Sequence, residues 1–334
     1  MTTRHFCTYF DHNYLPRGMV MLESLHAHCP QAIVHVLCLS DQCHAALAAL
    51  KYPFVRLLRL AELEAADKEL LAVRPTRSLI EYYFTLTPCL PWHLLHTVEG
   101  IDAITYLDAD MLFFSSPEPI FEEAGEAAVV LTPHKFSRHI AHLVCWGIYN
   151  VSWLTFANTQ EGLEALEWYR SACLEWCGDK LEGDRFADQK YLDTFPTRFK
   201  NVHIMQHAGG GLAPWNIADA HVEMSGGSTM VDGVPLVFYH AHGFKHIVGP
   251  YYSSGLRGYQ AKIHKVHAQA IFTPYVHALN RCTNVISANI AVQQLHSVRG
   301  EKTQGLLKTC KWLLKEWLSS TLVMAKKATP PAGT

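Results

Sequence analysis

Two aspartates separated by one small residue stand between two apolar runs of the sequence. Asp108 follows the run 104–107, and Asp110 precedes the run 111–114. Two like charges a few ångströms apart are costly to bury unless a cation neutralises them. Carboxylate oxygens are hard ligands, so this pair predicts a site for Mn²⁺ or Mg²⁺, an ion that keeps open positions for the phosphates of a substrate. The alternative is a loop in which both aspartates cap a turn.

A second polar cluster follows the apolar run 236–239 and could complete the metal site. His240 or His242 would add an imidazole ligand, which suits Mn²⁺ better than Ca²⁺. Gly243 permits close approach of the backbone to a phosphate, and Lys245 offers a positive charge for it. The alternative for a lone histidine is a structural role, but the close spacing of histidine, glycine and lysine favours a ligand-binding segment.

The spacing of apolar residues predicts the elements that would position these groups. A run without alternation is typical of a strand buried on both faces of a sheet, whereas a period near 3.6 predicts a helix. The expected strands of the first half are 6–10, 33–39, 55–60, 102–107 and 127–131, and the expected helices are 16–27, 43–50 and 79–95. This alternation predicts an α/β fold with a Rossmann-like, mostly parallel central sheet flanked by helices.

Ligands of such sheets bind outside the carboxyl ends of the strands, which is where Asp11 and Asp108 stand. For Asp11 alone, a role as a turn former is an equal alternative. We expect Pro88 and Pro91 to break the helix 79–95 near its end. In the second half, the pattern predicts helices at 161–177 and from 184 to 192, short strands at 202–206 and 236–239, and glycine loops at 209–211 and 226–227.

Composition excludes several classes of protein. Lysine and arginine number 28 and aspartate and glutamate 30, so the net charge of −2 provides no general basic surface for nucleic acid. Ten cysteines include no Cys-x-x-Cys pair, and we expect reduced, mostly buried thiols in a cytoplasmic protein. Residues 1–6 lack the apolar stretch of a signal peptide, and the uncharged run 139–160 is too polar for a membrane span.

In their order along the chain, these motifs resemble the GT-A-fold glycosyltransferases, which use nucleotide-sugar donors. The similarity is greatest to the family-eight-like retaining enzymes, which include bacterial lipopolysaccharide galactosyl- and glucosyltransferases and glycogenin. It covers about residues 5–250. The resemblance implies a GT-A catalytic domain at 1–255, a C-terminal helical extension at 256–325 and a disordered tail at 326–334.

The resemblance also implies which residues would hold the nucleotide and the metal ion. Those on the first strand and turn, at the uracil or ribose, are Thr8, Tyr9 and Asp11. The basic residue that would approach the diphosphate is Arg77. The metal ligands would be Asp108, Asp110 and His240, with Gly243 and Lys245 at the phosphates.

The sugar side of the site is implied in the same way. Asp188 and Gln189 would be the catalytic residues, because the Asp-Gln element of the family contacts the donor hexose and flanks its anomeric carbon. Asn150 would face the sugar as a substrate-binding residue. The loop that contains Trp215 and Asn216 would line the acceptor side.

The sequence departs from the family pattern in two places. Lys190 stands where a second aspartate often follows the Asp-Gln element. A single residue separates Gly243 from Lys245, where the family has two. This difference in spacing keeps His242 open as the metal ligand in place of His240.

The resemblance implies a metal-dependent hexosyltransferase. It would move a hexose from a nucleotide diphosphate sugar, with UDP preferred, to a hydroxyl of a glycan or glycolipid with retention of configuration, as in lipopolysaccharide biosynthesis. One alternative is a nucleotidyltransferase that makes such sugars, but the turn 11–14 lacks the glycine expected there. The other is a non-catalytic sugar-binding protein of the same fold, which the intact aspartate pair disfavours.

Near its end the sequence becomes rich in lysine, leucine and tryptophan, and the segment 306–318 has a helical period. A basic amphipathic helix with tryptophans is typical of a membrane interface. This predicts peripheral contact with the inner face of the cytoplasmic membrane through residues 300–320. The alternative is a helix that packs on the protein's own core.

Overall fold

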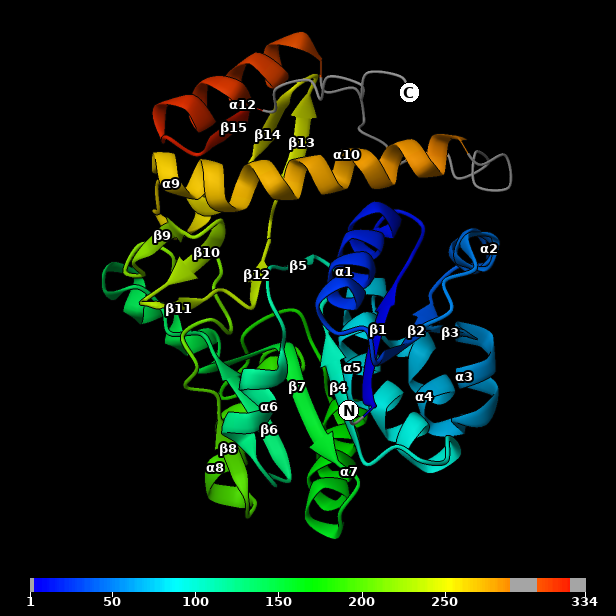
Figure 1. Cartoon of the computed structure of the whole chain (residues 1–334). Coiled ribbons are helices and arrows are strands. Elements are labelled where there is room, and N and C mark those ends of the chain that lie inside the picture. Colours follow the sequence, from blue (N-terminus) through cyan, green and yellow to red (C-terminus); the bar gives the residue numbers. More distant parts are fainter. Residues whose placement is uncertain (1–2, 289–304, 325–334) are drawn as a thin grey trace.

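The structure, a computed structural model, describes residues 3–288 and 305–324. Within residues 3–288 a seven-stranded sheet forms the centre of the fold, in the order β3-β2-β1-β4-β7-β6-β8 (Figure 1). The strands are β1 (Arg4–Phe10), β2 (Ala32–Cys38), β3 (Val55–Arg59), β4 (Ala103–Leu107), β6 (Val129–Pro133), β7 (Tyr149–Ala157) and β8 (Val202–Ile204). In this sheet β7 alone runs against its neighbours, so the expected mostly parallel sheet is confirmed.

Alternate residues of the strands pack into two hydrophobic cores, one on each face of the sheet. On β1, Phe6 and Phe10 enter one core and Cys7 enters the other, because successive side chains of a strand point to opposite faces. The helices over the first core are α1 (Leu15–His28), α2 (Asp41–Leu50), α6 (Glu118–Ala124) and α10 (Thr273–Ala288). Those over the second are α3 (Leu60–Ala66), α4 (Lys68–Val73), α5 (Leu79–Thr97), α7 (Gln160–Glu175) and α8 (Phe195–Arg198). All ten cysteines are free thiols, and eight of them are buried, as expected.

Helix α5 starts at a capping box and ends later than the sequence predicts. The Ser78 hydroxyl accepts a hydrogen bond from the Glu81 amide, and the Glu81 carboxylate accepts one from the Ser78 amide. The predicted break at Pro88 and Pro91 is wrong, since the helix continues through both prolines to Thr97. Each proline removes one backbone donor, but both are buried in the packing of α5, and this burial outweighs the loss.

The helix that the sequence predicts from 184 to 192 begins later in the structure. The segment from 184 forms a loop closed by a bridge between Glu182 and Arg185, followed by the 3₁₀ helix η3 (Gln189–Thr194). Ala187 adopts a positive φ of 47°, which a regular right-handed helix does not permit. The strand expected at 202–206 is confirmed as β8.

Three smaller sheets occur in the described residues. In the first, β5 (Met111–Phe113) pairs antiparallel with β12 (Phe238–His240), so that residue 240 lies opposite residue 111. The second contains β9 (Val222–Ser225), β10 (Ser228–Val231) and β11 (Val234–Pro235). The third contains β13 (Lys245–Val248), β14 (Tyr251–Ser253) and β15 (Leu322–Met324).

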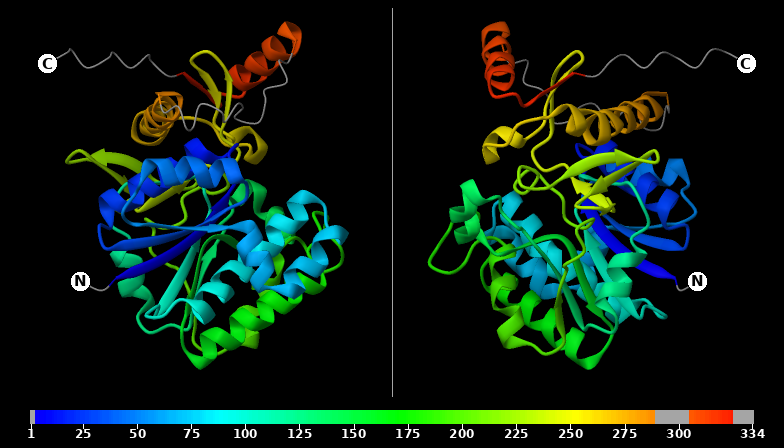
Figure 2. Two further views of the ribbon diagram at one scale, coloured as in Figure 1. Left: turned by 90° about the vertical axis from the view of Figure 1, so that its right-hand side faces the viewer. Right: turned by 60° about the vertical axis from the view of Figure 1, so that its left-hand side comes forward.

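The C-terminal helices lie beyond one end of the central sheet. Both views of Figure 2 place α12 (Leu306–Leu318) with β13 and β14 on the outer side of α10. The short helices between the strands and α10 are η4 (Leu256–Tyr259), α9 (Lys265–His267) and η5 (Ala268–Phe272). Among residues 3–288 and 305–324, the structure contains no helix long and apolar enough to cross a membrane. Part of the predicted extension and the predicted tail fall on 289–304 and 325–334, outside the described residues.

Candidate active site

The Asp-Ala-Asp segment crosses from the central sheet to the β5–β12 pair. The Asp108 amide donates a hydrogen bond to the carbonyl of Ser152 on β7 at 3.2 Å. The Asp110 carbonyl accepts one from the Ala241 amide at 2.9 Å, just beyond β12. Backbone pairing on both sides therefore fixes the two aspartates at the carboxyl end of β4 and brings His240 beside them.

His240 contacts both carboxylates. Its Nε2 lies 3.0 Å from Oδ1 of Asp110 and 3.6 Å from Oδ2 of Asp108. The side chain of His240 is 5% exposed, whereas those of Asp110 and Asp108 are 13% and 24% exposed. The other oxygen of Asp108, Oδ1, accepts a hydrogen bond from the Tyr106 hydroxyl at 3.0 Å. One imidazole and two carboxylates thus share a position that solvent reaches mainly at Asp108.

Burial and mutual charge shift the protonation of this trio. Burial raises the pKa of Asp108 to about 6, while the charge of His240 opposes the shift and Asp110 adds to it. Burial alone would also raise the pKa of Asp110, but the charge and hydrogen bond of His240 hold it well below its ordinary value. Burial would lower the pKa of His240, but the two carboxylates raise it. The arrangement therefore favours a positive charge beside the two aspartates.

The same side chains fit a divalent metal ion. Asp110, His240 and His242 each offer one ligand atom, and these atoms all lie within 4.8 Å of one another. With Oδ2 of Asp108 close to His240, the donor set consists of carboxylate oxygens and imidazole nitrogens, which suits Mn²⁺. Desolvation and the charge of His240 lower the pKa of His242, which favours the neutral imidazole that binds metals. Both histidines that the sequence left open belong to this cluster.

A further buried carboxyl group, Asp188, lies near the aspartate pair. It is 2% exposed, follows the positive-φ Ala187, and its Oδ2 has no hydrogen-bond partner within the described residues. Burial raises its pKa to about 7; a hydrogen bond with Thr87 opposes the shift, and the charge of Asp108 adds to it. Thr87 also shares a hydrogen bond with the Tyr9 hydroxyl at 3.0 Å. A buried, incompletely paired carboxyl group with a pKa near neutrality is typical of a functional site.

The loop that contains Trp215 borders the histidines. The centroid of the indole ring lies 5.2 Å from the ring centroid of His240 and 5.7 Å from that of His242. Asn216 shapes the loop, because its Oδ1 accepts a hydrogen bond from the Ala213 amide at 2.8 Å and its Nδ2 donates to two backbone carbonyls. The structure therefore brings Trp215 to the cluster and gives Asn216 a structural role beside it.

The residues expected at the nucleotide lie at the carboxyl end of β1. Thr8 is fully buried, and its Oγ1 has no partner in the part of the chain that the structure describes. The carboxylate of Asp11 accepts hydrogen bonds from the amides of Asn13 and Tyr14 at 2.9 and 3.2 Å. Asp11 thus stabilises the turn after β1, and its contact with the nucleotide stays a prediction.

Asn150 and Gln189 make local hydrogen bonds in the structure. Oδ1 of Asn150 accepts from the amide and hydroxyl of Ser152, and its Nδ2 donates to the Thr132 carbonyl at 3.3 Å. These bonds secure the irregular part of the β6–β7 pairing. Gln189 donates to the carbonyl of Trp146 at 3.0 Å, at the end of the 3₁₀ segment η2 (Arg138–Trp146). Both side chains therefore make structural hydrogen bonds, and their expected contacts with the sugar stay a prediction.

The chain turns after β12 at Gly243, whose φ of 72° lies in the region that favours glycine. Lys245 follows at the start of β13 and is exposed. Desolvation and the charge of His240 are the larger causes of the lowered pKa of His242, and the charge of Lys245 adds to them. Lys245 thus lies within electrostatic reach of the histidine cluster.

Two arginines bear on the charge near the aspartates: Arg77, whose place at the diphosphate stays a prediction, and Arg17, which the sequence did not suggest. Arg77 donates to two carbonyls at the C-terminal end of α7, at 3.3 and 2.8 Å, and so satisfies the last turn of that helix. Arg17 on α1 donates to the Phe244 carbonyl at 2.9 Å, and its charge helps to lower the pKa of Asp110. The sequence interpretation missed Arg17, although this residue stands just after the turn that ends β1, where ligands of such sheets bind.

The arrangement of elements matches a solved structure. Galactosyltransferase LgtC, crystallised in complex with donor and acceptor sugar analogs, superposes on this chain with a TM-score of 0.51 at 16% sequence identity. The match covers 89% of this chain and 98% of LgtC. The predicted GT-A fold of nucleotide-sugar glycosyltransferases is therefore confirmed.

Sequence relatives define the family within this fold. No family model matches the chain. The uncharacterized protein YfnD of Bacillus subtilis (strain 168) is 31% identical over 291 residues, which cover 86% of this chain and 92% of YfnD. The uncharacterized protein YfnF of the same strain is 29% identical over 251 residues, which cover 73% of this chain and 82% of YfnF. The chain belongs to the family of YfnD.

Proposed function

We propose that this protein is a metal-dependent glycosyltransferase that moves a hexose from a nucleotide diphosphate sugar, with UDP preferred, to a hydroxyl of a glycan or glycolipid with retention. The observation that carries the proposal is the cluster of Asp108, Asp110, His240 and His242 at the carboxyl end of β4, on a fold shared with galactosyltransferase LgtC. Ligands of α/β sheets bind at this edge. Clustered carboxylates and imidazoles are the groups that hold Mn²⁺ or Mg²⁺ beside phosphates.

The phosphate side of the proposed site must favour departure of the nucleoside diphosphate. The bond between C1 of the sugar and the β-phosphate oxygen breaks, and the nucleotide leaves with the electron pair. A divalent ion held by Asp108, Asp110 and a histidine would neutralise charge on that phosphate. Arg17 would add fixed positive charge in the role first expected of Arg77, because its charge already acts on Asp110.

The nucleotide and its phosphates would extend along neighbouring strand ends. Thr8, Tyr9 and the Asp11 turn would hold the uracil or ribose, and the unpartnered Oγ1 of Thr8 supports this placement. Gly243 and Lys245 would lie at the phosphates, because the positive φ of Gly243 exposes the backbone there and Lys245 acts on the histidine cluster.

The sugar side of the proposed site is built around Asp188. An oxocarbenium-like centre at C1 is stabilised by a nearby carboxylate, and the pKa of about 7 makes both forms of Asp188 accessible near neutral pH. Thr87 contacts both Asp188 and Tyr9, so this threonine would orient the carboxyl group. Gln189 and Asn150 would contact sugar hydroxyls, while Trp215 and Asn216 would line the acceptor side. There the acceptor oxygen would form the new bond to C1, and its proton would pass to the departing β-phosphate oxygen.

Release of UDP from UDP-hexoses in the presence of Mn²⁺ tests the proposal. We expect turnover with at least one hexose, its loss with a chelator, and a fall of about 10³-fold in Asp108→Ala, because the ligand set is broken. Asp184→Ala, which removes an exposed aspartate outside the cluster, should retain the wild-type rate. Release of pyrophosphate from UTP and a hexose 1-phosphate would instead identify a nucleotidyltransferase, and sugar binding without turnover a binding protein.

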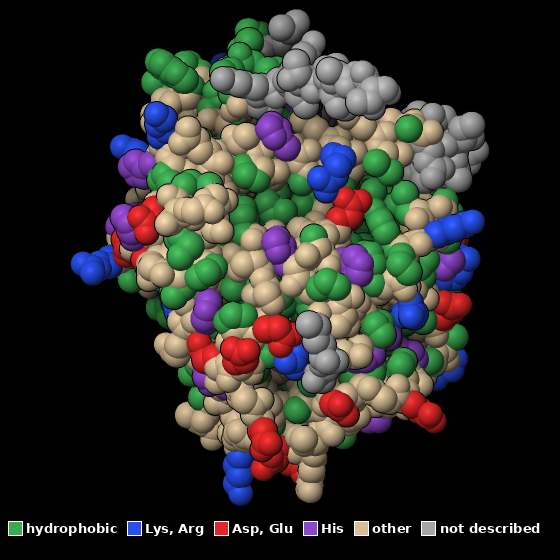
Figure 3. All heavy atoms as spheres, viewed as in Figure 1, with side chains coloured by type: hydrophobic (Ala, Val, Ile, Leu, Met, Phe, Trp, Pro, Cys, Tyr) green, Lys and Arg blue, Asp and Glu red, His purple; other side chains and the backbone are tan. Residues whose placement is uncertain are grey.

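The described part of the segment 300–320 supports a peripheral contact with the inner face of the cytoplasmic membrane. Leu307, Leu314, Trp317 and Leu318 on α12 are 54–80% exposed. Figure 3 shows hydrophobic side chains gathered at the edge of the molecule over α12. Replacing Leu314 and Leu318 together with serine should reduce sedimentation with vesicles that contain 30% phosphatidylglycerol; equal sedimentation would remove this contact from the proposal.

A further inference from the structure

A solvent-open cavity of about 380 Å³ lies between η4 and α12, and none of its lining residues belongs to the aspartate and histidine cluster. Its lining residues are Arg257, Lys308, Lys311, Trp312 and Lys315. The four residues from α12 follow one another at spacings of three, one and three, so they lie on one side of the helix. The cavity is therefore surrounded by four basic residues and one tryptophan, and carbon atoms of these side chains form most of its surface.

A buried carboxylate holds two of these lining side chains in place. Glu316 is 1% exposed, and its Oε1 accepts hydrogen bonds from Nε of Arg257 at 3.0 Å and from Nε1 of Trp312 at 3.2 Å. The other oxygen accepts one from the Thr321 hydroxyl at 2.6 Å. Glu316 thus orients the guanidinium and the indole from behind. Because Nε of Arg257 is occupied, its two terminal amino groups remain for another partner.

The three lysines carry charge that the fold does not neutralise. Within residues 3–288 and 305–324, no ion pair joins Lys308, Lys311 or Lys315 to an acidic side chain. Like charges three and four residues apart destabilise a helix. Glu316 offsets one of the four positive charges, so about three remain at a cavity of a protein whose net charge is −2. An anionic ligand would remove this repulsion.

We propose that the cavity between η4 and α12 binds a phosphoryl group. The planar donors of an arginine match two oxygens of a phosphate, and lysine ammonium groups supply further charge. The volume exceeds that of one phosphate and is in the range of small-ligand sites, so the rest of the molecule that carries the phosphate can lie along Trp312. This site is separate from the proposed sugar-transfer site and does not depend on it.

Two sources can provide such a group. A soluble phosphate compound would enter from solvent, whereas the headgroup of a phospholipid would enter while its chains cover the neighbouring exposed leucines of α12. Leu307 and Leu314 directly precede Lys308 and Lys315 in the sequence, so the apolar face and the cationic side of the helix are adjacent. The two sources differ in whether binding needs those leucines.

The test uses the full-length protein and two triple variants of equal charge. Lys308→Gln, Lys311→Gln and Lys315→Gln remove the cavity lysines, and Lys68→Gln, Lys180→Gln and Lys200→Gln remove three exposed lysines elsewhere. One arm titrates inorganic phosphate and glycerol 3-phosphate by calorimetry. The other measures sedimentation with vesicles of phosphatidylcholine that contain 30% phosphatidylglycerol. Neither measurement involves sugar transfer.

We expect the cavity variant to bind one of these probes about 100-fold more weakly than the control variant, because each lysine near an anionic surface contributes roughly fivefold. Loss in the soluble arm identifies a free phosphate compound. Loss confined to the vesicle arm, shared by the Leu314→Ser and Leu318→Ser double variant, identifies a lipid headgroup. A ligand-induced change in tryptophan emission should vanish in Trp312→Phe. If the two lysine variants bind every probe equally, or neither binds any, the proposal is overturned.

Discussion

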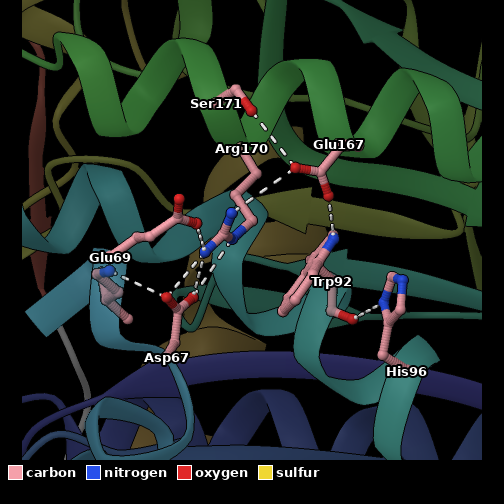
Figure 4. A network of polar contacts seen from close by, with 8 residues as sticks. Asp67, Glu69, Trp92, His96, Glu167, Arg170 and Ser171 are labelled. Carbon is pink, nitrogen blue, oxygen red and sulfur yellow. Dashed lines mark hydrogen bonds and ion pairs between the residues drawn. The ribbon is translucent and has the colours of Figure 1, made fainter.

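Two groups of buried carboxylates in this protein are compensated in different ways. In the first, shown in Figure 4, Asp67 and Arg170 form an ion pair whose side chains are 2% and 4% exposed. The guanidinium donates to both oxygens of Asp67 at 2.8 and 2.9 Å and also contacts Glu69 at 2.8 Å. Burial alone would lower the pKa of Arg170, but its hydrogen bonds to Asp67 and Glu69 raise it. The two buried charges of this network, Asp67 and Arg170, therefore neutralise each other.

The second group is matched less completely. Asp108 and Asp110 share the imidazole of His240, and Asp188 has no basic partner within the described residues. The pKa values of Asp108 and Asp188, raised by burial to about 6 and about 7, record the cost of these charges. The comparison indicates that the Arg170 network serves stability, whereas the second group retains charge that a ligand would neutralise.

The largest expected effect comes from breaking the matched pair. Arg170→Met should lower the free energy of unfolding by about 3–5 kcal/mol, because it leaves the Asp67 carboxylate buried without its cationic partner. Urea denaturation measures the change. The control is Arg281→Met, which breaks the more exposed pair with Glu23 and should cost less than about 1 kcal/mol. Equal losses in the two variants would contradict the distinction between buried and exposed pairs.

Metal binding should stabilise the protein through the second group alone. At a concentration of MnCl₂ 100 times its dissociation constant, the free energy of unfolding should rise by about 2.7 kcal/mol. Asp110→Asn should abolish this rise because it removes a ligand oxygen, whereas the exposed Asp184→Asn should leave it unchanged. Urea denaturation with and without manganese provides the measurement. A full rise in Asp110→Asn would show that the ion binds elsewhere.

The parts of this comparison differ in how far the sequence could predict them. The sequence predicted Asp108, Asp110 and His240 because each borders an apolar run, and the end of a buried strand is a local signal. The meeting of Thr87 with Tyr9 and Asp188 has no such signal, since Thr87 lies inside a helix and 78 residues after Tyr9. Contacts of this kind depend on how α5 packs against the sheet.

The same limit explains the residues whose surroundings differ from expectation. A local rule predicted a break at Pro88 and Pro91, but the rule omits the burial of α5 that keeps the helix intact. Arg77 and the carbonyls it caps are 96 and 97 residues apart, so its local sequence contains no sign of that contact. Arg17 was recognisable in principle, because strand order places the residues just after β1 next to those just after β4.

Asp188, whose Oδ2 has no hydrogen-bond partner within the described residues, should make stability depend on pH. Its pKa is about 3.9 in the unfolded chain and about 7 in the folded one, so between these values the folded state holds more protons and stability falls as pH rises. Asp188→Asn removes this loss. The variant should therefore be more stable than wild type by about 2 kcal/mol at pH 8, with a difference that shrinks toward pH 4.

Urea denaturation of both proteins at pH 4.5, 6 and 8 checks this dependence. The same variant should lose sugar transfer, so that stability and activity change in opposite directions. Lys180→Gln, which alters an exposed charge, should show neither effect. A variant that is less stable than wild type at pH 8 would mean that the Asp188 carboxylate is fully compensated in the folded protein.

The smallest expected effects separate the two arginines. Arg17→Met should raise the KM for the sugar donor about tenfold, or 1.4 kcal/mol, with little change in the urea midpoint, because Arg17 supplies charge beside Asp110. Arg77→Met should leave that KM unchanged and lower the free energy of unfolding by about 1 kcal/mol, because the end of α7 loses its cationic cap. Initial rates and urea curves of both variants give the four values. The reverse outcome would return the diphosphate role to Arg77 and leave Arg17 as a structural link between α1 and the segment after β12.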